Sequence, residues 1–327
     1  MKRRQLLSLS WPWPLWPAAA AATPPPQPQP LQCVVPAKPG GGFDVTCQLV
    51  RELLAAPPGP PLIVYHPGGI GALTYSEVVR GQRPHARELL AFSSGTLLNL
   101  AQGRFGAWRP DRIRWVAGLA MDHGVVAVHP ESPWRTLGQL LEALRSRPSS
   151  VAFAAGGTIG SQDWMKAALL ARAVGVSHKS LRVVAFEGGG DALRALQGRH
   201  VQVLCGDAAE LSAAPGSAAG TRLLAVLSPQ RLTGALASVP TAIEQGFDVS
   251  WPILRGVYTS VDYPAAELAT VVDQITRALR SPEHEARVRA RGLQPLALTG
   301  VALTQEVEAQ WARLAELARE FGVTVRR

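Results

Sequence analysis

"VVPAKPGGGFDVTCQLVRELL", residues 34–54, places Pro-Gly-Gly-Gly between a short apolar run and a helical pattern that opens on Phe43. The stretch "LIVYHPGGIGALTYSEVV", residues 62–79, repeats the order of apolar run, glycine turn and helix. Strands that alternate with helices are typical of α/β folds with parallel sheets. Both stretches therefore predict a glycine turn at the carboxyl end of a strand, where open α/β sheets bind ligands.

These glycine turns are candidate anion sites. A helix N-terminus presents free backbone N–H groups and the positive end of the helix dipole, so it binds an anion without a charged side chain. Residues 40–42 would expose successive N–H groups, with Phe43 over the ligand and Asp44 in the first helical turn. Residues 67–71 would do the same beside His66. The alternatives stay open: ordinary tight turns, an Asp44 that caps its helix and a His66 in an exposed loop.

The rest of the chain continues the alternation of strands and helices. Strands are predicted over residues 31–35, 62–65, 89–92, 151–155, 181–186, 201–205 and 223–227. Helices are predicted over residues 43–55, 70–80, 136–146, 161–174 and 189–197, with amphipathic helices after Pro264, after Ser281 and over 303–321. Glycine turns at 39–44, 67–71, 156–161 and 187–191 lie two in each half. The predicted fold class is α/β, with two similar lobes that face each other.

Composition excludes several classes of protein. The 327 residues are 47% hydrophobic and 17% charged, which is typical of a globular chain with room for two domains. The formal net charge is +9, but the basic residues form no stripe with interleaved aromatic residues, so nucleic acid is not an expected partner. The sequence contains no P-loop, dinucleotide fingerprint, GxSxG or HExxH motif, so neither a cofactor nor catalysis is predicted.

The N-terminus is typical of an export signal. The basic start "MKRR" precedes an apolar stretch and the small residues "AAAAA", so residues 1–22 are predicted to be a signal peptide. The Arg3-Arg4 pair resembles a twin-arginine signal, and both the twin-arginine and the Sec routes stay open. Residues 23–30 would form a stiff, proline-rich spacer. Removing residues 1–22 lowers the formal charge to +6, and we expect a mature protein that is soluble in the periplasm.

The cysteines and the polar residues after strands leave further alternatives open. Cys33, Cys47 and Cys205 lack metal-binding spacing and are interpreted as buried thiols or, for Cys33 and Cys47, as a disulfide. Hydroxyl and acidic residues at strand ends are either ligand contacts or structural caps and ion pairs. These residues are Ser94, Ser161, Glu187 and Asp207.

In this order the motifs resemble the periplasmic solute receptors of tripartite tricarboxylate transporters, the TctC-like or Bug-type receptors. "PGGGFD" (39–44) and "HPGGIG" (66–71) are similar to the first and second glycine turns of that family. "VAFAAGGTIGSQDWMKAALL" (151–170) resembles the start of the second lobe. "TRLLAVLSPQRLTGALASVPTAIEQGFDVSW" (221–251) is the most specific part, through its Val-Pro-Thr, Glu-x-Gly and Trp. The likeness extends over nearly all of the chain after the spacer.

The resemblance implies a two-lobed periplasmic-binding-protein fold of the Venus flytrap, type II-like class. Residues 31–127 with 254–327 would form lobe 1, and residues 128–253 lobe 2. A small organic acid or amino acid would bind between the lobes, and a monomeric receptor would deliver it to large and small permease subunits. With Ser94 and Asp207 added, the expected ligand-binding residues are Gly41, Gly42, Phe43, Asp44, His66, Gly68, Gly69, Ile70, Gly71, Ser94, Gly160, Ser161, Phe186, Glu187, Gly188, Gly189 and Asp207.

Two positions depart from the family pattern, and other functions fit the same fold. His66 lies near a position where the family usually has Asn. Phe186-Glu187 stands where the family usually has Tyr followed by Lys or a similar residue, and this difference leaves room for a ligand with an amine or a hydroxyl. A sensory receptor would use the same cleft and differ only in its membrane partner. An enzyme would require an essential His or Asp in the cleft. The effector domain of a transcription regulator is disfavoured, because residues 1–30 contain no DNA-binding module.

Overall fold

The computed structural model describes residues 30–55, 59–83, 87–104, 106, 108–212 and 220–325. The predicted signal peptide and residues 23–29 of the predicted spacer lie outside the described residues. Within these ranges, no helix combines the length and the apolar character needed to cross a membrane.

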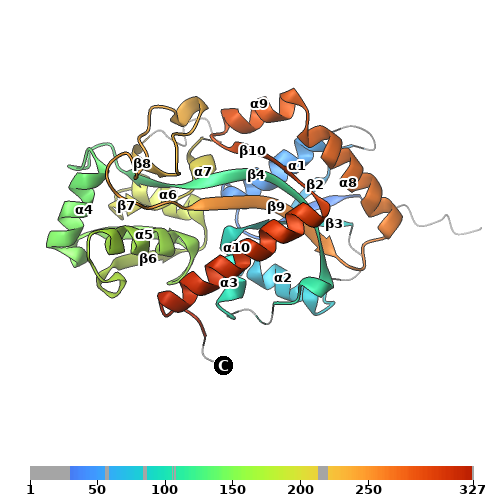
Figure 1. Ribbon diagram of the computed structural model, residues 1–327, viewed down its shortest axis with the longest axis horizontal. Coiled ribbons are helices and arrows are strands. Elements are labelled where there is room, and N and C mark those ends of the chain that lie inside the picture. The colour runs from blue at the N-terminus through green and yellow to red at the C-terminus, as the bar shows by residue number, and fades with distance from the viewer. Residues whose placement is uncertain are drawn as a thin grey trace, which may run out of the picture.

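Two groups of parallel strands form the outer parts of the sheet (Figure 1). In the first group, β1 (Gln32–Val35) lies between β2 (Leu62–Tyr65) and β3 (Glu88–Ser93). In the second group, β5 (Ala152–Gly156) lies between β6 (Arg182–Phe186) and β7 (Val203–Leu204). These six predicted strands are confirmed, with ends that shift by one or two residues, and so is the seventh, β8 (Arg222–Leu227).

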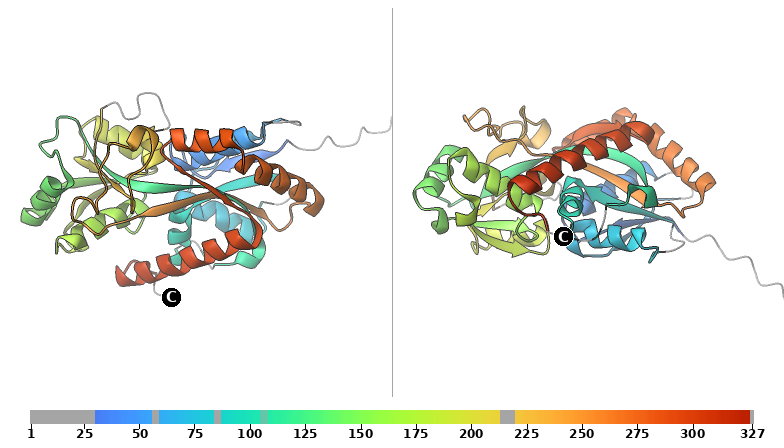
Figure 2. Two further views of the ribbon diagram at one scale, coloured as in Figure 1. Left: turned by 45° about the horizontal axis from the view of Figure 1, so that its top comes forward. Right: turned by 60° about the horizontal axis from the view of Figure 1, so that its bottom comes forward.

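Long antiparallel strands join the two groups (Figures 1 and 2). β9 (Pro252–Ser260) pairs with β3 and with β4 (Ile113–Val128). The far end of β4 pairs with β7 and β8, and β10 (Gln294–Leu298) is added along its first half. Because β4 pairs with strands in both halves of the molecule and β9 runs beside it, the fold is two-lobed with β4 and β9 as a central ribbon. The predicted lobe boundaries fall at the end of β4 and the start of β9, and they stay predictions.

Helices follow the parallel strands and cover the sheet. The helices that pack on the first group and along β4 are α1 (Gly42–Leu53), α2 (Ala72–Val79), α3 (Ser94–Ala101), α8 (Ala265–Leu279), α9 (Pro282–Ala290) and α10 (Gly300–Glu320). Those of the second group are α4 (Leu137–Ser146), α5 (Gln162–Ala173), α6 (Gly189–Gln197) and α7 (Ala208–Ser212). Short 3-10 turns are η1 (Gly69–Gly71), η2 (Pro110–Arg112), η3 (Pro148–Ser150), η4 (His178–Ser180) and η5 (Gly234–Leu236).

The predicted apolar stripes of the C-terminal helices are core residues. α8 buries Leu268, Val271, Ile275 and Leu279 against α1 and β4. α10 lies across α3 and β4 (Figure 2), and Leu303, Val307 and Leu314 are buried on its inner face. Both helices therefore hold the first lobe together.

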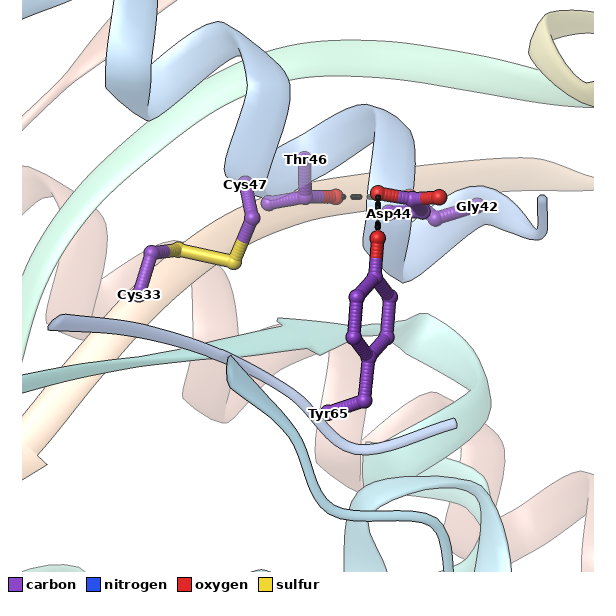
Figure 3. Close-up of a disulfide and its surroundings, with 6 residues drawn as sticks. All are labelled: Cys33, Gly42, Asp44, Thr46, Cys47 and Tyr65. Atoms are coloured by element: carbon purple, nitrogen blue, oxygen red, sulfur yellow. Dashed lines mark hydrogen bonds between the residues drawn. A yellow bond between two sulfur atoms is a disulfide. The ribbon is translucent and has the colours of Figure 1, made fainter. Parts of the chain in front are cut away.

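The first glycine turn is tied to its strand by a disulfide between Cys33 of β1 and Cys47 of α1 (Figure 3). The sequence left this pairing open beside the alternative of buried thiols. Cys205 is the buried free thiol of the described residues. The disulfide restricts how far α1 can move away from β1.

Candidate functional site

The N-terminus of α1 lies at the carboxyl end of β1. Gly41 precedes the helix in an extended conformation, and the N–H of Gly42 donates to Oε1 of Glu210 at 3.0 Å. The carboxylate of Asp44 accepts from the N–H of Gly40 at 2.8 Å and from the hydroxyl of Tyr65 at 3.1 Å (Figure 3). The contacts of Asp44 are thus those of a residue that braces the helix terminus.

The second turn contains a residue in a strained conformation. Ile70 has φ 52° and ψ 52°, a left-handed conformation that costs a non-glycine residue about 1–2 kcal/mol. The turn is held by Asn99, whose Nδ2 donates to the carbonyl of Gly69 at 2.9 Å. The Ile70 side chain reaches the opposite lobe, because a Cβ added to Gly157 would collide with its Cδ1. Such strain persists where the surroundings fix it, and it is frequent at ligand sites.

Two turns of the second parallel group face the first pair. α5 begins after Ser161, whose hydroxyl accepts from the N–H of Trp164 at 3.4 Å, and α6 begins after Gly188. Lys38 of the first turn lies 2.6 Å from Oε2 of Glu187 and 3.7 Å from Oδ2 of Asp191. Lys38 and Glu187 are each about half exposed, so this ion pair contributes little to stability on its own.

The four turns surround a cleft of about 570 Å³, counting the open space at its mouth. Its lining comes from both parallel groups and from the central ribbon. The predicted residues that line it are Gly41, Gly42, Phe43, Ile70, Glu187, Gly188, Gly189 and Asp207. A concave site that draws backbone N–H groups from two lobes is the usual form of a small-molecule site.

Other predicted residues lie outside this lining and have contacts elsewhere. Nε2 of His66 lies 2.9 Å from Oε2 of Glu77. The buried hydroxyl of Ser94 donates to Gln310 at 2.6 Å and accepts from the N–H of Leu254 at 2.9 Å. The remaining predicted residues outside the lining are Asp44, Gly68, Gly69, Gly71, Gly160, Ser161 and Phe186. Their role as ligand contacts stays a prediction.

A buried ion network forms the floor of the cleft. The guanidinium of Arg255, which is 1% exposed, contacts Asp122 through Nε at 2.8 Å and Asp207 through Nη2 at 2.8 Å. Nζ of Lys166 lies 2.8 Å from Asp207 and 2.8 Å from Asp163. Burial lowers the pKa of Lys166, but the adjacent carboxylates more than offset it, so its pKa is raised and the ammonium stays charged.

Glu210 of α7 lies above this network with its carboxylate at the N-terminus of α1. Burial, followed by the charges of Asp207 and Asp163, raises the pKa of Glu210 to about 8, while Arg255 and Lys166 act in the opposite direction. In the described part of the chain, Glu210 makes no salt bridge. Its carboxylate therefore differs from its acidic neighbours, each of which has a cationic partner.

Most of this network could not be predicted from the sequence. One local signal was available: Asp163 and Lys166 are three residues apart in "QDWMKAALLARA", on a helix that is otherwise largely apolar and buried. A charged pair in such a helix indicates a buried ion pair. Arg255, Asp122 and Glu210 carry no comparable signal, because their partners are distant in the sequence. Among the described residues, no group of three or more His, Cys, Asp or Glu could hold a metal ion.

The packing at Gly42 gives a first prediction. Gly42→Ala should lower the free energy of unfolding by about 1–3 kcal/mol, because the new Cβ would collide with the buried guanidinium of Arg255. Gly41→Ala is the matched control, since its Cβ would lie 3.6 Å from Glu210, an ordinary contact. Urea unfolding followed by circular dichroism measures both, and equal losses in the two variants would contradict this packing.

The comparisons with known proteins agree with this geometry. Residues 105–323 match the family described as "Tripartite tricarboxylate transporter family receptor". The UPF0065 protein in the TAR-I ttuE-ttuC' intergenic region of Agrobacterium vitis is 25% identical over 294 residues, which cover 88% of this chain and 83% of that protein.

Two solved structures have the same two-lobed fold. R. palustris Rpa4515 with adipate has a TM-score of 0.80 and 21% identity, over 90% of this chain and 97% of that one. MatC from Rhodopseudomonas palustris with bound malate has a TM-score of 0.76 and 23% identity, over 88% and 98%. Because the family match spans more than half of the sequence, the chain belongs to the solute-binding receptors of the tripartite tricarboxylate transporter family.

Proposed function

We propose that this receptor captures a small carboxylate-containing solute in the cleft between its lobes and delivers it to the large and small permease subunits of a tripartite transporter. The proposal places the protein in the periplasm as a monomer, with residues 31–127 and 254–327 in lobe 1 and 128–253 in lobe 2. The observation that carries it is the opposition of glycine turns from two lobes across one cleft.

The chemistry of these turns supports a carboxylate ligand. The N-termini of α1 and α6 both open on the cleft through glycines, so backbone N–H groups and helix dipoles favour a negative group there. The ligands named for the two similar structures, adipate and malate, are small carboxylates. Closing the lobes on the solute would give the permease a shape that the ligand-free receptor lacks.

A thermal-shift screen of residues 23–327 tests the proposal. Amino acids, organic acids and neutral sugars would be compared, and a carboxylate at one hundred times its Kd should raise the Tm by about 5 °C, because it binds only the folded state. Neutral sugars should leave the Tm unchanged. A Tm that no carboxylate raises would contradict the proposed ligand class.

A cleft-filling variant separates binding in this cleft from binding elsewhere. Gly188 lines the cleft with φ −168°, and an added Cβ would meet no atom within 4 Å. Gly188→Leu should therefore fold normally and lose the thermal shift. Gly138→Leu on α4 is the control, because Gly138 does not line the cleft, and it should keep the shift. Retained binding in Gly188→Leu would place the ligand site elsewhere.

A further inference from the structure

The charged side chains around the cleft include more acids than cations. Each cation there already has an acidic partner: Lys38 pairs with Glu187 and Asp191, Arg194 with Asp191, Lys166 with Asp163 and Asp207, and Arg255 with Asp122 and Asp207. Among the described acids that line this cleft, Glu210 is the one left without a cationic partner. The cleft is thus complementary to a cationic group, although its helix termini favour anions.

The Glu210 carboxylate occupies the anion position itself. Its Oε1 accepts the hydrogen bond from the N–H of Gly42, the first residue of α1. A Cβ added to Gly189 would collide with both of its oxygens, so the same carboxylate also touches the first turn of α6. A solute carboxylate at this point would lose the Gly42 donor and would lie against a second carboxylate.

We propose that Glu210 is the specificity-determining residue of the cleft and selects a solute that carries an ammonium group as well as its carboxylate, as an amino acid does. The inference rests on the proposed solute-binding function. The ammonium would lie at Glu210, where it completes the missing ion pair. The solute carboxylate would be held by other N–H groups of the glycine turns. A dicarboxylate of the same length would instead place two carboxylates together.

The protonation of Glu210 gives the proposal a second signature. With a pKa raised to about 8, Glu210 is largely protonated at pH 6 in the ligand-free cleft. An ammonium favours the ionised form, so binding releases a proton, and the affinity for an amino acid should rise between pH 6 and pH 8. A dicarboxylate requires the protonated form, so its affinity should fall over the same range.

Charged groups surround Glu210 from every element that packs near it. They are Asp44 of α1, Asp122 of β4, Asp163 and Lys166 of α5, Asp191 and Arg194 of α6, Asp207 before α7, Arg255 of β9, and Arg291, which is paired with Glu52. Burial raises the pKa of Asp207, but Lys166 and Arg255 more than offset it, so its pKa is lowered. Adjacent carboxylates raise the pKa of Lys166 and of Arg255, whereas burial raises the pKa of Asp122 and of Asp163 against the charges of those two cations. The part of the pH profile that Glu210→Gln removes is therefore the part that reports the titration of Glu210.

Isothermal titration calorimetry with pairs of an amino acid and a dicarboxylate of equal length tests the proposal. L-aspartate against succinate and L-glutamate against glutarate differ within each pair by the ammonium group. In the pair whose length fits the cleft, the wild-type protein at pH 8 should bind the amino acid about 10–100-fold more tightly than the dicarboxylate, as expected for a hydrogen bond between charged groups. Glu210→Gln should reduce this ratio to about one and remove the pH dependence. Glu308→Gln, an exposed acid on α10, is the control and should leave the ratio unchanged.

The possible outcomes separate the two proposals. If the wild-type protein binds the dicarboxylate as tightly as its amino acid, or if Glu210→Gln leaves the ratio unchanged, the role of Glu210 is overturned while the receptor function stands. If none of these solutes and no other carboxylate binds any of the three proteins, the proposed function fails and this inference fails with it. The wild-type comparison of each amino acid with its dicarboxylate needs no variant, so it decides the matter even where Glu210→Gln does not fold.

Discussion

Arg255→Met should lower the free energy of unfolding at pH 7 by about 3–5 kcal/mol, because it leaves two buried carboxylates without their shared cation. Asp207 keeps Lys166, but Asp122 keeps only the N–H groups of His123 and Ala209. Urea unfolding measured by circular dichroism at pH 7 gives the difference. A loss below about 1 kcal/mol would contradict a structural role for this network.

Two comparisons identify the cause of that loss. Arg277→Met removes an exposed i,i+4 pair with Asp273, whose contribution should not exceed about 0.5 kcal/mol. Adding Asp122→Asn to Arg255→Met removes the unpaired charge, so the double variant should be more stable than the sum of the single losses predicts.

The pH dependence of the Arg255→Met loss has a definite sign. Burial already raises the pKa of Asp122, with Arg255 opposing it, so losing Arg255 should raise that pKa further. A carboxyl whose pKa is higher in the folded state than in the unfolded state destabilises the protein above the unfolded pKa. The deficit of Arg255→Met against wild type should therefore shrink as the pH falls toward 4.

The glycine turns could be predicted because all of their information is local. In each case an apolar run, a Pro-Gly or Gly-Gly turn and a helical period follow one another directly, and the helix begins where the turn ends. The helix N-caps at Ser161 and Ser281 could also be predicted from local sequence, since each serine hydroxyl accepts a hydrogen bond from the N–H of the residue three positions later. Of the residues predicted from these turns and from the family resemblance together, eight line the cleft.

The central ribbon of β4 and β9 could not be predicted, because its residues suit contacts with segments that are distant in the sequence. β4 reads "IRWVAGLAMDHGVVAV", in which Asp122 and His123 interrupt the apolar pattern of a strand. Asp122 is tolerated there because Arg255 of β9 neutralises it. Gly124 of β4 is required by packing, because a Cβ at this position would collide with the side chain of Lys166. β9, β10, α3 and α7 were missed as well.

Glu210 is the part of the site for which sequence reasoning had least to offer. Its hydrogen bond to Gly42 joins residues 168 positions apart, and "GDAAEL" resembles any short polar helix start. The family resemblance placed candidate ligand contacts at Gly41 and Gly42, and both line the cleft. Their role as an anion site stays a prediction. The resemblance could not show that a carboxylate of the same chain reaches one of them.

Breaking the Cys33–Cys47 disulfide should lower the free energy of unfolding by about 3 kcal/mol. The two cysteines are 14 residues apart, and a cross-link that closes a loop of this length restricts the unfolded chain by about that amount. Urea unfolding of the wild-type protein with and without dithiothreitol measures the effect. Cys33→Ala with Cys47→Ala should match the reduced wild-type protein and should not respond to dithiothreitol.

The same change should also reach the cleft. Cys47 lies five residues after Gly42 on α1, so the disulfide fixes the helix whose N-terminus carries the candidate anion site (Figure 3). Reduction of the disulfide should therefore weaken solute binding even without urea, where the protein stays folded, because α1 can then shift away from β1. Cys205→Ala is the control: its buried thiol makes no disulfide, so the response of that variant to dithiothreitol should equal that of the wild type. A wild-type protein whose unfolding is unchanged by dithiothreitol would contradict the stabilising role of the bond.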